Sequence, residues 1–194
     1  MVLFGLFCLA GYQNTAGRSE ITSTTWPVES RIQRTPGMPT LVMMVHPHCP
    51  CSRASIGEFA ILMAKVQGVV NANVVFVKPA DFPEAWEKTD LWTSATMIPG
   101  VKVGVDDGGS EARRFRSHTS GQILLYSVNG QLLFSGGITA GRAHFGDNAG
   151  LSAVVSLLIQ GNSQTKETSV FGCPLFEEDR TGKEEELCHV PHGK

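Results

Sequence analysis

The residues with the clearest chemical potential gather in one short segment, residues 46–51, whose sequence is HPHCPC. A cysteine thiolate attacks disulfides and binds soft metal ions, and the imidazole of histidine binds copper and zinc. Two histidines and two cysteines within this segment therefore predict one of two chemistries, thiol-disulfide exchange or metal binding.

The flanking sequence predicts that a strand feeds a helix across this segment. Residues 40–46 form a continuous apolar run of strand length, which is typical of a buried central strand. From Ser52 onward, apolar residues recur at helical spacing as far as Gly68, where a helix stop is expected. The free amides and positive dipole end of a helix N-terminus stabilise a thiolate. The cysteines should therefore lie in an activating position.

Within this arrangement each residue of the Cys-Pro-Cys sequence has an expected role. Pro50 suits the first helical position, where its missing N–H costs nothing. Cys49 is then expected to be the exposed nucleophile, and Cys51 the resolving thiol. Residues spaced in this way lie about 5.5 Å apart in a helical turn, within disulfide range. The ring so closed is small, which favours an oxidising disulfide.

The remaining patterns predict alternating strands and helices. We expect further strands over 73–77, 101–105, 122–128 and 131–134, and helices from Pro83 through Trp86 and Trp92, over 111–115 and over 151–159. Asn129 and Gly130 predict a hairpin turn, and Asp147 or Asn148 can cap the last helix. This order predicts an α/β fold with a central mixed sheet and helices on both faces.

The composition divides the chain into a core domain and two extensions. Residues 1–37 comprise an apolar segment and a polar linker, residues 38–161 form the domain, and residues 162–194 form a polar C-terminal tail. The net charge of -2 and the absence of a basic stripe argue against nucleic-acid binding.

The order of elements and the cysteine segment resemble the thioredoxin superfamily over residues 40–160, especially membrane-tethered bacterial members of the TlpA/ResA kind. Cys49 and Cys51 match the two cysteines of that family, with one intervening residue fewer. The combination of HPHCPCSR, Thr119-Ser120-Gly121 and the later SGGIT and HFGDN sequences also looks like a bacterial group labelled RedB. The resemblance implies a thioredoxin-like fold and thiol-disulfide oxidoreductase activity.

The same resemblance implies which residues surround the cysteines. Where the family has a cis-proline before the penultimate strand, this sequence has no proline. The residues implied as lining the site are His48, Pro50, His118, Thr119, Ser120, Gly121, Gly137 and His144. Arg142 or a protonated His144 would lower the pKa of a nearby thiol. Gly137 as a plain backbone turn and His144 as an ordinary loop residue remain open alternatives.

Two other functions remain open. His46, His48, Cys49 and Cys51 are all ligands that suit copper or zinc, so a copper-delivering thioredoxin relative of the Sco kind is the main alternative. In that case a distant histidine, His118 or His144, would complete the site. Four ligands packed this closely in sequence cannot easily point at one tetrahedral centre, so redox chemistry without a cofactor is favoured. A non-catalytic interaction domain is the third possibility.

The ends of the chain bear on its location. The apolar run over residues 1–10 is typical of a signal peptide or the end of a membrane anchor, with a buried first helix as the alternative. We expect a periplasmic or other extracytoplasmic protein whose partners are disulfide- or thiol-bearing envelope proteins. In that compartment Cys173 and Cys188 are expected to form a structural disulfide. A resolving thiol or a metal clasp is the alternative role for this pair.

Overall fold

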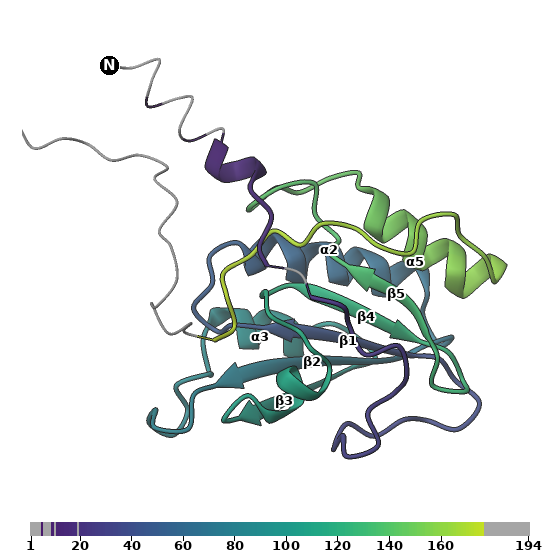
Figure 1. Cartoon of the computed structure of the whole chain (residues 1–194), viewed down its shortest axis with the longest axis horizontal. Coiled ribbons are helices and arrows are strands. Elements are labelled where there is room, and N and C mark those ends of the chain that lie inside the picture. The colour runs from purple at the N-terminus through teal and green to yellow at the C-terminus, as the bar shows by residue number, and fades with distance from the viewer. Residues whose placement is uncertain (1–4, 6–8, 10, 19, 177–194) are drawn as a thin grey trace, which may run out of the picture.

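The computed structural model describes residues 5, 9, 11–18 and 20–176. Its elements, shown in Figure 1, are β1 (Thr40–Val45), α2 (Ser52–Lys65), β2 (Asn71–Lys78), α3 (Asp90–Thr96), β3 (Val101–Asp107), α4 (Ser110–Arg114), β4 (Gln122–Tyr126), β5 (Leu132–Gly136) and α5 (Ala149–Gln160). They build a five-stranded sheet in the order β3-β2-β1-β4-β5. β1, β2 and β3 are parallel, whereas β4 runs antiparallel to β1 and β5. The predicted mixed α/β sheet is confirmed.

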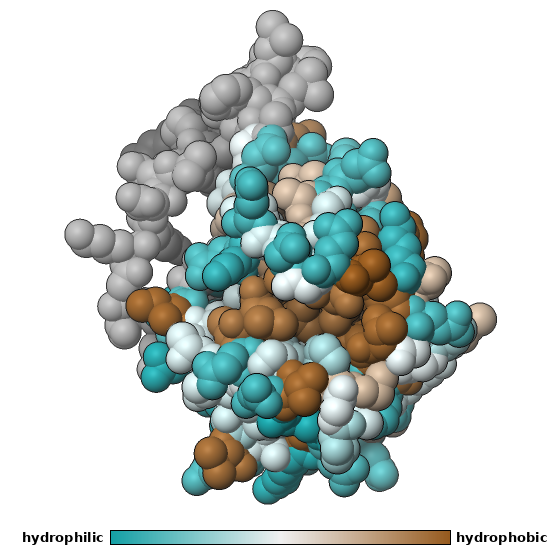
Figure 2. Space-filling model, turned by 90° about the vertical axis from the view of Figure 1, so that its right-hand side faces the viewer, coloured by the Kyte–Doolittle hydropathy of each residue, from teal (hydrophilic) through white to brown (hydrophobic). Residues whose placement is uncertain are grey.

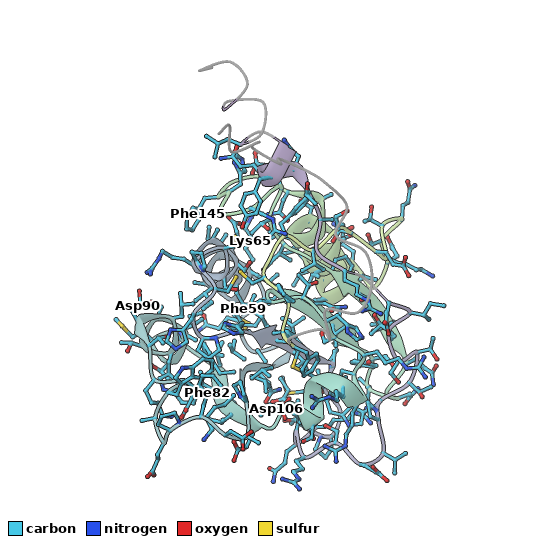
Figure 3. The ribbon with its side chains drawn as sticks, turned by 60° about the vertical axis from the view of Figure 1, so that its left-hand side comes forward. Phe59, Lys65, Phe82, Asp90, Asp106 and Phe145 are labelled. Atoms are coloured by element: carbon cyan, nitrogen blue, oxygen red, sulfur yellow. The ribbon has the colours of Figure 1, made fainter. Side chains whose placement is uncertain are left out.

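The central strand β1 is buried on both faces, which explains its uninterrupted apolar sequence. On one face, the side chains of Leu41 and Met43 pack in a core that includes α2, α3 and α5. On the other face, Val42 and Met44 pack in a second core with α4. Helices therefore cover both faces of the sheet. Phe59 of α2 is fully buried in the first core (Figure 3).

The hairpin and the starts of α4 and α5 follow from local chemistry. Gly130 adopts a φ of 78° between β4 and β5, as the predicted turn requires. The Asn148 side chain accepts a hydrogen bond from the Leu151 amide at 2.7 Å and caps α5. Buried Asp106 accepts hydrogen bonds from the amides of Glu111 (2.9 Å) and Ala112 (2.8 Å), which fixes α4 after β3 (Figure 3).

One predicted helix starts later than its sequence pattern indicates. Instead of a helix from Pro83, the structure has turns over this stretch, and α3 begins only at Asp90. Ala85 has a positive φ of 66°, a conformation that interrupts a right-handed helix. Trp86 therefore lies in a turn, whereas Trp92 lies within α3 as predicted.

After α5 the chain returns across the domain. α5 ends at Gln160 and is capped by Gly161, which has a φ of 77°. Beyond it, the Lys166 carbonyl accepts a hydrogen bond from the Ser135 amide at 3.0 Å. Further on, Pro174 pairs antiparallel with Thr119. The part of the predicted C-terminal tail that the structure describes, residues 162–176, thus runs along the sheet edge and toward the cysteine turn.

The face shown in Figure 2 mixes polar side chains with an apolar band. Figure 2 shows this brown band across one face of the molecule, bordered by teal polar residues. Within residues 5, 9, 11–18 and 20–176, no helix has both the length and the apolar character needed to cross a membrane. Most of the apolar run predicted as a signal or anchor, residues 1–10, lies outside the described residues.

Candidate active site

The two cysteines of the motif lie in the turn that joins β1 to α2. The Cys49 amide donates to the His46 carbonyl at 3.1 Å, and the Cys49 carbonyl accepts from the Ser52 amide at 3.1 Å. These three-residue spacings make a turn tighter than an α-helix. α2 therefore begins at Ser52, with Cys51 as its N-cap residue. Pro50 lies in the turn, so its prediction as the first helical residue is wrong.

Cys49 is buried, with only 1% of its surface exposed, so the prediction of an exposed nucleophile is wrong. The residues that cover it come from the far end of the domain. The amide of Cys173, 124 positions later in the chain, donates to the Cys49 sulfur at 3.3 Å. A third cysteine therefore stands directly beside the predicted nucleophile.

The Cys49 sulfur is surrounded by hydrogen-bond donors, which favour its thiolate form. The Cys173 thiol is the strongest influence, and the Ser52 side chain and the amides of both residues add to it. Burial acts in the opposite direction, because it penalises a charge. The donors prevail and lower the pKa of Cys49 from 9.0 to about 4. Hydrogen bonding to Cys49, followed by burial, raises the pKa of Cys173, so at neutral pH a thiolate faces a thiol.

The predicted loop over residues 118–121 meets the cysteine turn through Ser120. The fully buried Ser120 hydroxyl oxygen accepts a hydrogen bond from the His46 amide at 2.7 Å and lies 2.6 Å from the Ser52 hydroxyl. Next to it, the Gly121 amide donates to the Met44 carbonyl at 2.7 Å. Gly121 has a φ of 88°, and a Cβ there would lie 2.7 Å from the Ser55 hydroxyl, so glycine is required. Ser120 thus joins the turn, α2 and the loop.

Replacing Ser120 with alanine is expected to destabilise the domain by about 1–3 kcal/mol, because the partly buried His46 amide loses its hydrogen-bond acceptor. Urea denaturation of the reduced protein measures this loss. Ser94→Ala is a matched control, since Ser94 is an exposed serine on α3 that also makes a hydrogen bond. Its effect should stay within about 0.5 kcal/mol. Equal stabilities for the two variants would contradict the bridging role of Ser120.

The two histidines of the motif pack with Trp86. The rings of His46 and His48 lie 5.6 and 4.5 Å from the Trp86 ring, measured between centroids. Nε2 of His48 lies 3.2 Å from the Trp86 carbonyl oxygen. Burial lowers the pKa of His46, a nearby His48 lowers it further, and the Cys49 charge acts in the opposite direction. These side chains form one wall beside the cysteines.

Some of the other residues predicted to line the site lie beside it, and others lie further away. Thr119 lies beside the site, where its hydroxyl donates to the Arg18 carbonyl at 2.8 Å, whereas His118 pairs with Glu20 at 3.0 Å. His144 is exposed in the loop before α5. The Gly137 carbonyl accepts a hydrogen bond from the Thr168 hydroxyl, as a structural turn residue does.

Arg142 reaches the site through the backbone. Its guanidinium donates to the Gly172 carbonyl at 2.8 Å and to the Thr15 carbonyl at 3.2 Å. The positive charge acts to lower the pKa of Cys173, against the larger influences that raise it. The predicted cation therefore acts on Cys173, for which a resolving thiol was only the alternative to a structural disulfide.

The structure gives the alternative metal site little geometric basis. In the described part of the chain, no three histidine, cysteine, aspartate or glutamate side chains are grouped closely enough to hold a metal ion. Cys49, Cys51 and Cys173 are all free thiols. Cys188, the predicted disulfide partner of Cys173, lies outside the described residues, so that pairing stays a prediction.

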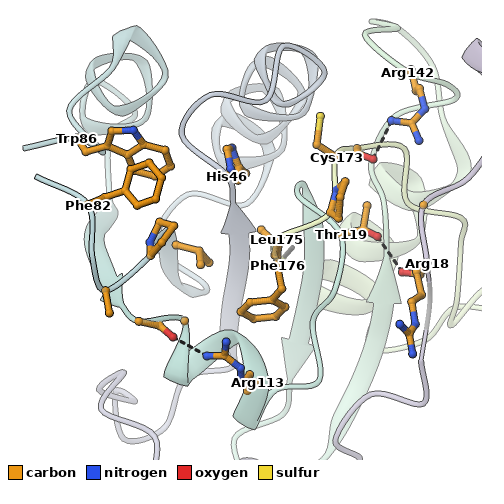
Figure 4. Close-up of a pocket in the computed structure, with 18 residues that line it drawn as sticks. Arg18, His46, Phe82, Trp86, Arg113, Thr119, Arg142, Cys173, Leu175 and Phe176 are labelled. Carbon is orange, nitrogen blue, oxygen red and sulfur yellow. Dashed lines mark hydrogen bonds between the residues drawn. The ribbon is translucent and has the colours of Figure 1, made fainter. Parts of the chain in front are cut away.

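A cavity of about 1050 Å³ opens beside Cys173 and His46 (Figure 4). Aromatic side chains and arginines line it, among them Phe82, Trp86, Phe176, Arg18, Arg113 and Arg142. In Figure 4, Phe82 and Trp86 lie on one side of the cavity, and Cys173 and Arg142 on the other. Of the three cysteines of the site, Cys173 lines this cavity, whereas Cys49 and Cys51 are buried.

Comparisons with known proteins place the fold. No protein-family profile matches the chain, and no curated protein sequence matches it. Among solved structures, it is similar to an uncharacterised conserved protein from Geobacillus kaustophilus, with a TM-score of 0.61 and 13% identity over 87% of this chain and 95% of that one. A hypothetical protein from Sinorhizobium meliloti gives a TM-score of 0.57 and 16% identity over 83% and 93%.

A third similar structure is a protein of known fold type. The solution structure of a thioredoxin-like protein in its oxidised form matches with a TM-score of 0.51 and 13% identity, over 78% of this chain and 97% of that one. The fold is therefore thioredoxin-like, as the order of elements predicts.

Proposed function

We propose that this protein is a thiol-disulfide oxidoreductase in which the Cys49 thiolate attacks a disulfide of a partner protein. The observation that carries the proposal is the environment of the Cys49 sulfur. Donors from Cys173 and Ser52 lower the pKa of Cys49 to about 4, and a second thiol stands beside it. A thiolate is the nucleophile of disulfide exchange, and an adjacent thiol is needed to complete the reaction.

The reaction has two exchange steps. The Cys49 sulfur attacks one sulfur of the partner disulfide, forms a mixed disulfide and expels the other partner sulfur as a thiolate. A second thiol of the site then attacks the Cys49 sulfur and releases the partner. Cys51, which the motif spacing predicts for this step, and Cys173 both lie in the site as free thiols. Because Cys49 is 1% exposed, the segment around Cys173 must move aside when a partner disulfide enters.

The proposed setting is extracytoplasmic, with the protein secreted or anchored at a membrane. The apolar run over residues 1–10 supports this location, because its length is that of a signal-peptide apolar region. The partners are then envelope proteins that carry disulfides or thiols. The apolar and arginine-bordered cavity beside Cys173 provides a surface for part of such a partner.

The proposal is tested by measuring turnover and metal binding on the same full-length protein. We expect the reduced protein to catalyse reduction of insulin disulfides with dithiothreitol as electron source, and to bind Cu(I) and Zn(II) only weakly. Stoichiometric, tight Cu(I) binding without turnover would instead identify a copper carrier. A protein that shows no turnover and no metal binding would instead be an interaction domain. Each of these two outcomes would overturn the redox proposal.

A further inference from the structure

The segment Gly172–Phe176 is held across the active site by backbone hydrogen bonds at both ends. The Ser120 amide donates to the Cys173 carbonyl at 2.8 Å, and the Leu175 amide donates to the His118 carbonyl at 2.8 Å. Together with the antiparallel pairing of Thr119 and Pro174, these bonds make the segment a short strand on the Ser120 loop. The cysteine in this strand is thereby held at a defined position.

The fit of the segment at Gly172 is close. A Cβ on Gly172 would lie 1.9 Å from the Ser120 carbonyl oxygen, so only glycine allows the chain to approach the loop at this point. Arg142 donates to the Gly172 carbonyl from the other side at 2.8 Å. The placement of Cys173 is therefore determined by specific contacts on both sides of the residue before it.

Cys173 is the cysteine whose backbone amide contacts the Cys49 sulfur. The Cys173 amide donates a hydrogen bond to that sulfur at 3.3 Å, and the Cys173 side chain is the largest influence that lowers the pKa of Cys49. Formation of a disulfide requires two cysteines whose backbones lie within about 7 Å of each other, and the amide contact brings the Cys173 backbone next to the Cys49 side chain. A bridge from Cys49 to Cys51 would instead close a small ring around Pro50, whose φ is fixed. The remote cysteine is thus the less constrained partner.

The charges in the site set the order of events. Hydrogen bonding to the Cys49 thiolate is the main reason that the pKa of Cys173 is raised, and Arg142 acts in the opposite direction. When Cys49 enters a mixed disulfide, its negative charge is lost. The main cause of the raised pKa of Cys173 is then removed. The Cys173 thiol then ionises more easily, so it becomes nucleophilic only after Cys49 has reacted.

We propose that Cys173, rather than Cys51, is the resolving thiol, and that the oxidised protein carries a Cys49–Cys173 disulfide. This inference rests on the proposed function. In the resolving step the Cys173 sulfur attacks the Cys49 sulfur, a Cys49–Cys173 bond forms, and the bond from Cys49 to the partner breaks. The partner disulfide is reduced by two electrons, and the two cysteines are oxidised. The two partner thiolates take up one proton from Cys173 and one from water.

Peptide mapping after oxidation tests the inference, with oxidised glutathione as the disulfide. Trypsin places Cys49 and Cys51 together in peptide 35–53, Cys173 in peptide 167–180 and Cys188 in peptide 184–194. The reduced full-length protein is mixed with oxidised glutathione, quenched in acid, digested without reductant and analysed by mass spectrometry. We expect peptide 35–53 to be joined to peptide 167–180.

Two serine variants assign the roles. In Cys51→Ser the joined peptides should form as in the wild type, which identifies Cys49 as the bridged residue. In Cys173→Ser the glutathione adduct on Cys49 should persist instead of being released. An internal bridge within peptide 35–53, a bridge between peptides 167–180 and 184–194, or rapid release of glutathione in Cys173→Ser would each overturn the inference.

The failure of this inference can be told from the failure of the proposed function. If peptide 35–53 of the Cys51→Ser variant never acquires glutathione or a bridge, Cys49 does not attack disulfides, and the function itself is wrong. If Cys49 acquires glutathione and releases it with Cys173 absent, the function stands and only the role of Cys173 is wrong.

Discussion

Replacing Cys49 with serine is expected to lower disulfide reductase turnover by about 10³-fold or more, since loss of an enzyme's nucleophile commonly costs at least this much. A serine hydroxyl is not ionised at neutral pH and does not attack disulfides. The hydrogen bonds that lower the pKa of Cys49 would then have no thiolate to stabilise. Insulin reduction with dithiothreitol as electron source measures the effect.

The matched control for this variant is Cys51→Ser, which changes a buried cysteine of the same turn in the same way. We expect Cys51→Ser to keep most of the wild-type turnover. Thermal denaturation of both variants establishes that they are folded. A folded Cys49→Ser protein with turnover close to that of the wild type would show that another residue performs the attack.

The reactivity of Cys49 is expected to depend little on pH between about pH 8 and about pH 5.5, because its pKa lies near 4. For a thiol with an ordinary pKa of about 8.5, the fraction present as thiolate falls about tenfold for each pH unit below that value. The two cases therefore differ by about 100-fold or more in their pH dependence over this range. The rate of iodoacetamide modification of peptide 35–53, measured in the Cys51→Ser variant, reports on Cys49 alone.

Cys173→Ala provides the contrast for this pH profile. The Cys173 thiol is the largest influence that lowers the pKa of Cys49, so its removal should shift the inflection to higher pH. The Cys49 charge also raises the pKa of nearby His46, but burial is the larger influence and lowers it. An unchanged inflection in Cys173→Ala would show that Ser52 and the backbone amides alone hold the thiolate.

The parts of the fold that local sequence determines were predictable. The apolar run of β1 indicates a strand buried on both faces, Asn129 and Gly130 indicate the hairpin, and Asn148 caps α5 through its own side chain. Each of these features depends on interactions within a few residues or on burial. The late start of α3 was not predictable in this way, because the positive φ of Ala85 breaks a pattern that reads as helical.

The candidate site was predicted only where it is local. The turn containing Cys49 and Cys51, and the loop containing Ser120, were both identified from the sequence. The prediction that Cys49 is exposed was wrong, because Cys173 lies against it. Backbone hydrogen bonds to Ser120 and His118 hold the Cys173 segment there, and no local sequence pattern predicts such long-range bonds. The expected oxidising compartment favoured a structural disulfide between Cys173 and Cys188, and a resolving thiol was only the alternative.

The distance in sequence between Cys49 and Cys173 means that a disulfide between them would affect the stability of the whole domain. A bond between residues 124 positions apart would enclose four of the five strands, β2 to β5, in one covalent loop. Cross-linking a loop of this size restricts the unfolded chain by about 5 kcal/mol in the chain-entropy description. The oxidised domain would then be cross-linked and more resistant to unfolding and proteolysis. Each reduction of the disulfide would remove this stabilisation.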